Sequence, residues 1–166
     1  ADERRTEIMN VSGEVEDESL IPEETCVYTL TSMGYIKRQP LENYKQQKRG
    51  GRGMKGMSRR EEDVADTMFT CSSHDFIMFF TTKGRAYKLK GYEIPEGSRQ
   101  SKGMNVVNLL PLDADEKISS MLPVPKEENG EFLCMVTKNG IIKRTELANF
   151  KHIRKTGIIA LSLDDN

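Results

Sequence analysis

The sequence contains one short pattern three times: Thr31-Ser32-Met33-Gly34, Thr81-Thr82-Lys83-Gly84 and Thr137-Lys138-Asn139-Gly140. A basic side chain follows each copy within three or four residues, and the glycines are 50 and then 56 residues apart. A second marker, a glycine followed by an apolar residue, recurs in the same order as Lys55-Gly56-Met57, Lys102-Gly103-Met104 and Thr156-Gly157-Ile158. Two markers that repeat together indicate an array of structural repeats, each roughly 50 residues long.

Each repeat has the composition of short β-strands. The runs that precede the three glycines are rich in β-branched and aromatic residues, namely Cys26–Thr31, Phe76–Thr81 and Phe132–Thr137. Asn139-Gly140 predicts a type I′ hairpin turn, because both residues tolerate a positive φ. Residues 41–49 could form a helical turn, and no stretch has a sustained 3.6-residue apolar period. We therefore predict an all-β, propeller-like fold with about four strands in each repeat.

An acidic segment precedes the repeats. Residues 11–24 contain almost no large apolar side chains, and we interpret them as a linker. The expected organisation is the end of a preceding domain plus this linker at residues 1–24, and three blades at residues 25–166, with the chain ending in the middle of a blade. Propellers usually close with about 4–8 blades. We therefore expect unpaired strand edges at Cys26–Thr31 and near Ile158–Leu163, where two copies of the chain could associate.

The net charge of −1 hides a strong alternation of sign along the chain. Residues 1–27 sum to −7, whereas the basic blocks at residues 35–60, 83–102 and 138–155 sum to +8, +4 and +5. Each repeat therefore carries one basic block. This pattern predicts a folded protein with a basic rim and an acidic remainder.

Composition argues against several other classes of protein. The longest apolar runs, such as Phe76–Phe80, are far shorter than the ~18 residues of a membrane span, and no signal-peptide pattern begins the chain. Three cysteines without a C-x-x-C pair form neither a disulfide framework nor a zinc cluster. The tyrosines lack the basic partner and acidic cluster that a DNA-cleaving nucleophile needs. We expect a cytoplasmic, non-catalytic domain with no metal, no cofactor and no membrane contact.

The most informative segment is Gln46–Gly56, between the first and second repeats. It satisfies G-x-G-x-x-G, but no buried strand precedes the motif and no helix follows it, as a dinucleotide site requires. A P-loop fails because Met57 occupies the lysine position. Two interpretations remain: an RGG-type RNA-binding arm, and a basic loop that binds a DNA backbone. The DNA loop is favoured, because glycines let the main chain approach phosphates that Lys48, Arg49, Arg52 and Lys55 neutralise.

The segment also carries a resemblance. Gln47-Lys48-Arg49-Gly50-Gly51-Arg52-Gly53 matches every position of the Q-[RK]-R-G-G-[RK]-G box of the bacterial DNA gyrase A family. Residues 1–8 resemble the end of the breakage-reunion part of that protein, and residues 34–38 and 107–112 resemble its first and second blades. The resemblance covers essentially the whole chain. It implies the N-terminal half of the C-terminal DNA-wrapping domain, with about three blades of a six-bladed β-pinwheel whose blades exchange strands.

The function that this resemblance implies is sequence-tolerant binding and wrapping of double-stranded DNA. Wrapping supports ATP-dependent negative supercoiling by the gyrase holoenzyme, a type II topoisomerase of A2B2 composition. The implied partners are the rest of gyrase A together with gyrase B, on the bacterial nucleoid, with ATP and magnesium on other domains. The residues alone leave an alternative open, a β-repeat interaction module that binds protein or RNA through its basic face.

The expected DNA-binding residues come from the box and from the three basic blocks. They are Gln47, Lys48, Arg49, Gly50, Gly51, Arg52, Gly53 and Lys55 in the box, and Lys37, Arg38, Lys88, Lys90, Lys143, Arg144, Arg154 and Lys155 on the rim.

Overall fold

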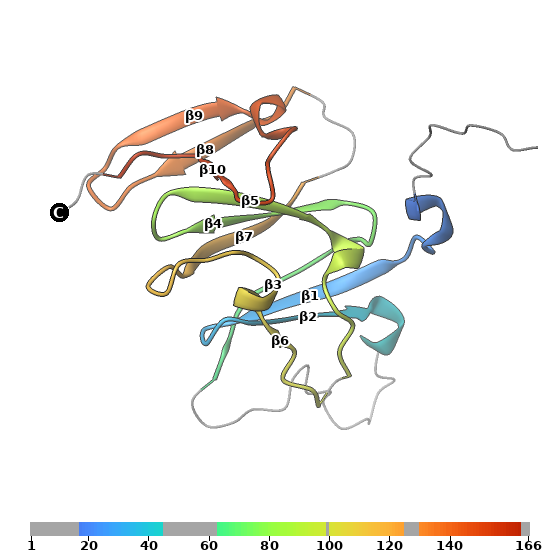
Figure 1. Cartoon of the computed structure of the whole chain (residues 1–166). Helices are drawn as coiled ribbons and strands as arrows, with labels where there is room; N and C mark the ends of the chain where they lie inside the picture. The colour runs from blue at the N-terminus through green and yellow to red at the C-terminus, as the bar shows by residue number, and fades with distance from the viewer. Residues whose placement is uncertain (1–16, 45–62, 99, 125–129, 164–166) are drawn as a thin grey trace, which may run out of the picture.

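A computed structural model describes residues 17–44, 63–98, 100–124 and 130–163. These residues form three antiparallel sheets that lie one beside the next (Figure 1). We call them blades 1, 2 and 3. The prediction of an all-β fold is confirmed.

Blade 1 is built on one hairpin, formed by β1 (Thr25–Thr31) and β2 (Tyr35–Pro40). Strand β3 (Ala65–Ser72) pairs with β1, and the two-residue strand β6 (Met104–Asn105) pairs with β2. The strand order is therefore β3-β1-β2-β6.

Blade 2 repeats this arrangement around the hairpin of β4 (Phe76–Thr81) and β5 (Arg85–Lys90). Its outer strands are β7 (Ile118–Val124) beside β4 and β10 (Ile158–Ile159) beside β5. In blade 3 the described residues form one hairpin of two strands, β8 (Phe132–Val136) and β9 (Ile142–Glu146). The short 3-10 helices are η1 (Asp17–Leu20), η2 (Leu41–Tyr44), η3 (Gly91–Glu93), η4 (Val106–Asn108) and η5 (Leu147–Phe150). The expected four strands per repeat are thus present in blades 1 and 2.

The blades exchange strands, as the resemblance implied. Strand β6 follows the hairpin of blade 2 in the sequence but pairs in blade 1, and β10 follows the hairpin of blade 3 but pairs in blade 2. Two copies of the second sequence marker, at Gly103 and Gly157, lie at these points, and the first copy, at Gly56, lies outside the described residues. A Cβ on Gly103 would come within 2.5 Å of the Ile36 carbonyl oxygen, and one on Gly157 within 3.0 Å of the Ala86 carbonyl oxygen. The marker glycines allow the chain to approach the preceding blade closely.

The Thr-x-x-Gly pattern forms the turn of each hairpin. Gly34, Gly84 and Gly140 have φ of +81°, +74° and +82°, and each donates its N–H to the carbonyl of the threonine three residues earlier. The threonine hydroxyl then accepts the N–H of the residue after the glycine at 3.1, 3.3 and 3.1 Å. The expected type I′ turn at Asn139 is wrong, because Asn139 does not have a positive φ. The glycine alone is left-handed, as in three-residue hairpin loops.

The hydrophobic core lies between the blades. On β4, Ile77 and Phe79 pack with Tyr28 of blade 1, whereas Met78 on the opposite face belongs to a second cluster with Phe150, next to blade 3. Strand β4 is therefore buried on both faces, which explains its uninterrupted apolar sequence.

One expectation about the ends of the repeats is wrong. Cys26–Thr31 was expected to be an unpaired edge, but β1 lies inside blade 1 with β2 and β3 on either side, because β3 returns from residues far along the chain. Residues 17–24, the end of the expected linker, form η1 and a segment that contacts blades 1 and 2. The helical turn expected at residues 41–49 begins as η2, and residues 45–49 lie outside the described residues. None of the helices in the described part of the chain is long and apolar enough to cross a membrane.

The turn glycines give a matched test of the fold. Gly140→Ala meets no atom within 4 Å and should cost about 1–2 kcal/mol of unfolding free energy, from the left-handed backbone alone. Gly84→Ala should cost more, because its Cβ would also collide with the Leu161 main chain, which follows β10. Urea unfolding of both variants measures the difference. Equal losses would contradict the close approach of that segment to Gly84.

Candidate nucleic-acid interface

The expected DNA-binding residues fall into three groups. Those of the box, Gln47, Lys48, Arg49, Gly50, Gly51, Arg52, Gly53 and Lys55, lie outside the described residues. Those of blades 1 and 2 are largely covered, and those near blade 3 are exposed. The structure therefore does not bring the rim residues together on one uniform basic surface.

In blade 1, Lys37 is only 1% exposed. Its Nζ donates to the carbonyl oxygens of Ser98 at 2.9 Å and Ser101 at 3.0 Å, in the connection that leads to β6. Burial lowers the pKa of the Lys37 ammonium. Lys37 therefore fastens the exchanged strand to blade 1, and we leave it out of the candidate DNA surface.

Arg38, Lys88 and Lys90 are half-buried and engaged. Arg38 forms an ion pair with Glu24 at 3.0 Å, and Lys90 forms one with Glu18 at the same distance. Lys88 lies 3.9 Å above the Phe76 ring and contacts the Phe150 and Lys151 carbonyl oxygens at 3.3 and 3.4 Å. Any contact of these three side chains with DNA competes with partners that they already have.

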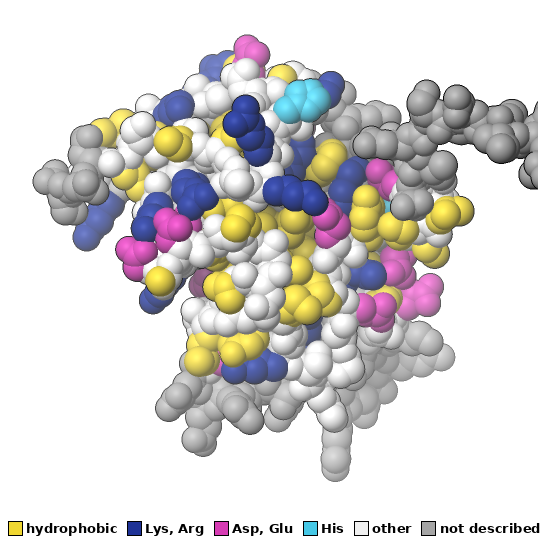
Figure 2. All heavy atoms as spheres, in the orientation of Figure 1, with side chains coloured by type: hydrophobic (Ala, Val, Ile, Leu, Met, Phe, Trp, Pro, Cys, Tyr) yellow, Lys and Arg dark blue, Asp and Glu magenta, His cyan; other side chains and the backbone are white. Residues whose placement is uncertain are grey.

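The basic side chains of β9 and of the segment between η5 and β10, near blade 3, are arranged differently. All of these are exposed. Figure 2 shows several Lys and Arg side chains, separated by other side chains, in the upper part of the molecule, where Figure 1 places β9 and η5. We call this set the blade 3 basic surface: Lys143, Arg144, Lys151, Arg154 and Lys155. Lys151 was missing from the expected site residues, although it belongs to the same basic block of the sequence.

Local structure holds this surface in place. The Gly157 N–H donates to the Arg154 carbonyl at 2.8 Å, which closes a turn, and Arg85 Nη2 donates to the Thr156 carbonyl at 2.6 Å. Lys143 Nζ donates to the Ala160 carbonyl at 2.7 Å. The Arg144 guanidinium lies 3.7 Å above the Phe132 ring, a cation–π contact that orients the side chain without neutralising its charge.

The blade 3 basic surface carries uncompensated charge. Within the described parts of the chain, no carboxylate lies within ion-pair distance of its five side chains. Lys83 on blade 2 is the opposite case, because its Nζ pairs with Asp115 at 2.7 Å and Asp113 at 3.2 Å. Hydrogen bonds to these two carboxylates raise the pKa of Lys83. Exposed, unpaired cations can exchange their counterions for phosphates, whereas Lys83 would first lose its carboxylates.

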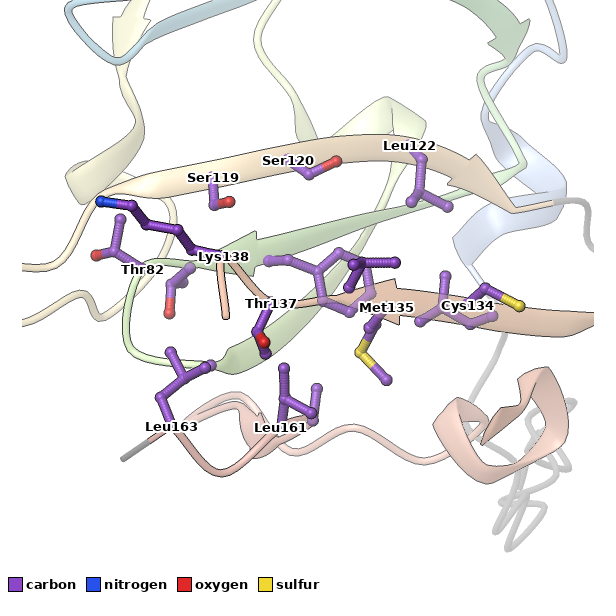
Figure 3. Close-up of a pocket in the computed structure, with 16 residues that line it drawn as sticks. Thr82, Ser119, Ser120, Leu122, Cys134, Met135, Thr137, Lys138, Leu161 and Leu163 are labelled. Carbon is purple, nitrogen blue, oxygen red and sulfur yellow. The ribbon is translucent and has the colours of Figure 1, made fainter. Parts of the chain in front are cut away.

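A groove of about 600 Å³ separates blades 2 and 3. Figure 3 shows Ser119, Ser120 and Leu122 on one side of it, Cys134 and Met135 on β8, and Leu161 and Leu163 on the segment opposite. Among the described residues that line it there is no histidine, aspartate or glutamate. The groove therefore offers neither a carboxylate nor an imidazole for acid–base chemistry.

Catalytic and metal chemistry remain matters of expectation. Among the residues described, no three His, Cys, Asp or Glu side chains are grouped so that they could hold a metal ion. The buried carboxylate of Glu116 has a structural role, because it accepts from Asp113 N at 3.0 Å and Arg85 Nη1 at 3.1 Å at the entrance to β7. That no metal, cofactor or catalytic group belongs to this domain stays a prediction.

A family model and proteins similar to this chain point to the same protein family. The model of the DNA gyrase C-terminal domain, a β-propeller, matches residues 27–72, 75–125 and 131–166, which correspond to the three repeats. The DNA gyrase A protein of Clostridium acetobutylicum is 49% identical over 165 residues, and that of Staphylococcus aureus is 51% identical over 167. Each alignment covers 99% of this chain, but only 20% and 19% of the relative. The chain thus spans about a fifth of the length of these relatives.

Solved structures agree with the fold. The C-terminal domain of DNA topoisomerase IV superimposes with a TM-score of 0.72 at 26% identity, covering 88% of this chain and 44% of that one. The DNA gyrase A C-terminal domain gives a TM-score of 0.65 at 27% identity, covering 86% and 45%.

The variant Lys37→Met tests whether Lys37 has a structural role or a DNA-binding role. The variant should lose about 1–2 kcal/mol of unfolding free energy at neutral pH, because two carbonyls lose their donor. Folding lowers the pKa of Lys37, so the unfolded chain binds more protons between that lowered pKa and about 10.4. The wild type should therefore gain stability relative to the variant as pH rises through this window. Urea unfolding at several pH values measures both effects, and an unchanged difference across the window would contradict the buried ammonium.

Proposed function

The chain belongs to the family of DNA gyrase C-terminal domains, and from this premise we propose that it binds double-stranded DNA and wraps it along a basic rim. The observation that carries the proposal is the blade 3 basic surface, with five exposed cations and no carboxylate partner among the described residues. A polyanion would gain from such a surface through release of its counterions. The box residues, Gln47–Gly53 and Lys55, are proposed to contact the same DNA.

Binding is proposed to tolerate any base sequence. The helices of the described residues are single 3-10 turns of three or four residues, too short to lie along a major groove and read base edges. The exposed lysines and arginines are instead suited to phosphate oxygens, which position DNA without reading its sequence. Any preference would then come from the ease of bending the duplex.

The domain is proposed to act as a non-catalytic part of a larger enzyme. Wrapping would support ATP-dependent negative supercoiling by a holoenzyme of two A and two B subunits in the bacterial cytoplasm, in association with the nucleoid. ATP and magnesium would bind to other domains of that assembly. An interaction module that binds protein or RNA is the alternative, and a preference for short single-stranded RNA over long duplex DNA would favour it.

The salt dependence of binding tests the DNA proposal. If about 5–8 phosphates are neutralised, log affinity for a duplex several helical turns long should fall with log salt at a slope of about −4 to −7. Replacing Lys151, Arg154 and Lys155 with alanine should make this slope shallower by about 2–3, because three phosphate contacts are lost.

Lys83→Ala is the control. Lys83 is exposed on blade 2 but is already paired with Asp113 and Asp115, so the slope should change by less than about one. A slope near zero for the wild type would overturn the DNA proposal. Equal changes in the triple variant and the control would overturn the assignment to the blade 3 basic surface.

The box is proposed to fasten the bend rather than to supply affinity. Alanine at Lys48, Arg49 and Arg52 should reduce the linking-number change left in closed circular DNA after treatment with a relaxing enzyme, with a smaller effect on affinity. The blade 3 triple variant should mainly lose affinity. Parallel losses of topology change and affinity in both variants would refute this division.

A further inference from the structure

The two junctions between blades differ in what covers their basic side chains. At the junction of blades 2 and 3, the blade 3 basic surface is exposed. At the junction of blades 1 and 2, residues 17–24 contact both blades. We call residues 17–24 the acidic strap.

On blade 2 the strap contacts Lys90. Glu18 Oε1 lies 3.0 Å from Lys90 Nζ, and the two side chains are only 16% and 14% exposed. Lys90 Nζ also donates to the His74 carbonyl at 3.2 Å, and the His74 ring nitrogen Nε2 lies 2.9 Å from the Ile21 carbonyl. A half-buried ion pair of this kind is screened less by salt than an exposed one.

On blade 1 the strap contacts Arg38. Glu24 Oε1 lies 3.0 Å from Arg38 Nη1. The strap main chain is fixed beside this pair, because the Glu24 N–H donates to Ser73 Oγ at 3.1 Å and the Ser73 N–H donates to the Glu24 carbonyl at 2.8 Å. Ser72 Oγ donates to a carboxylate oxygen of Glu23 at 2.7 Å. The strap thus docks on the turn that connects β3 to β4.

The repeat supplies an internal comparison. Counting from the turn glycines, Arg38 of blade 1 corresponds to Lys88 of blade 2 and to Arg144 of blade 3. Of the described carboxylates, Glu24 pairs with Arg38, whereas none pairs with Arg144. The same position of the fold is therefore neutralised by the strap in blade 1 and exposed in blade 3.

We propose that the acidic strap is an autoinhibitory contact that competes with the DNA backbone for Arg38 and Lys90. The proposal rests on the proposed DNA-binding function and adds its regulation. The Glu18 and Glu24 carboxylates occupy the donors that phosphate oxygens would use, so DNA reaches the junction of blades 1 and 2 only when the strap is released. By thermodynamic linkage, DNA then weakens strap docking by the same factor as the strap weakens DNA binding.

The test uses Glu18→Gln/Glu24→Gln in the full chain, with a long duplex at low salt. Affinity should rise about fivefold or more, the lower end of typical allosteric coupling, and the salt slope should steepen by about 1–2 because two further cations become available. Asp66→Asn/Glu131→Gln is the control. It removes the same charge from exposed residues that make no ion pair among the described residues, and affinity should change less than about twofold.

A second measurement needs no variant. Hydrogen exchange of the backbone amides at residues 17–24 should accelerate when the wild type binds the duplex. If the wild type binds DNA with a steep salt slope but the strap variant matches the control and strap exchange is unchanged, the strap proposal is wrong and the DNA function stands. If the wild type shows no salt-dependent binding at all, the DNA function itself is wrong.

Discussion

The exchange of short strands between blades is the constraint on which the rest of this structure depends. A blade is complete only when the chain has passed through the next hairpin and returned a two-residue strand, β6 or β10, to the blade before it. Two residues of pairing supply few hydrogen bonds. The return is secured by glycines that let the backbones approach, and in blade 1 by the buried Lys37 ammonium, which holds the connection leading to β6. The segment between η5 and β10, which presents Lys151, Arg154 and Lys155, is held at one end by its own exchanged strand.

Features of the fold encoded within a few residues were predictable from the sequence. The Thr-x-x-Gly pattern marked the three repeats in the sequence because each hairpin loop requires both a left-handed glycine and a threonine side-chain acceptor. The predictions that were wrong concern features that depend on residues distant in the chain or on the length of a loop. The prediction of a positive φ at Asn139 is wrong because Asn-Gly suits a two-residue loop, whereas the loop between Thr137 and Ile141 has three residues. The prediction of an edge at β1 is wrong because no local feature of the sequence shows that β3 returns to pair with it.

The candidate DNA-binding residues were also predictable only in part. The sequence shows how many charged residues the chain has, whereas DNA binding depends on which of their side chains are exposed and unpaired. Lys37 and Lys143 both lie three residues after a turn glycine, yet Lys37 is enclosed by the connection to β6 and Lys143 is exposed. The acidic block before the repeats was visible in the composition, but its contact with Arg38 and Lys90 was not. That contact depends on the connection between β3 and β4, some 50 residues later in the chain.

The fold alone does not determine which function a chain of this kind performs. The solved C-terminal domains of topoisomerase IV and of gyrase A both share this architecture at similar, low sequence identity. Strand exchange and inter-blade packing would be needed whatever the rim binds, since they serve stability. The alignment with gyrase A proteins, in which about one residue in two is identical, extends over almost the whole chain and so covers the rim and box segments. Function on this scaffold therefore depends on exposed side chains that the fold does not need for its stability. An acidic segment docked on basic positions can change that function without any change in the architecture of the blades.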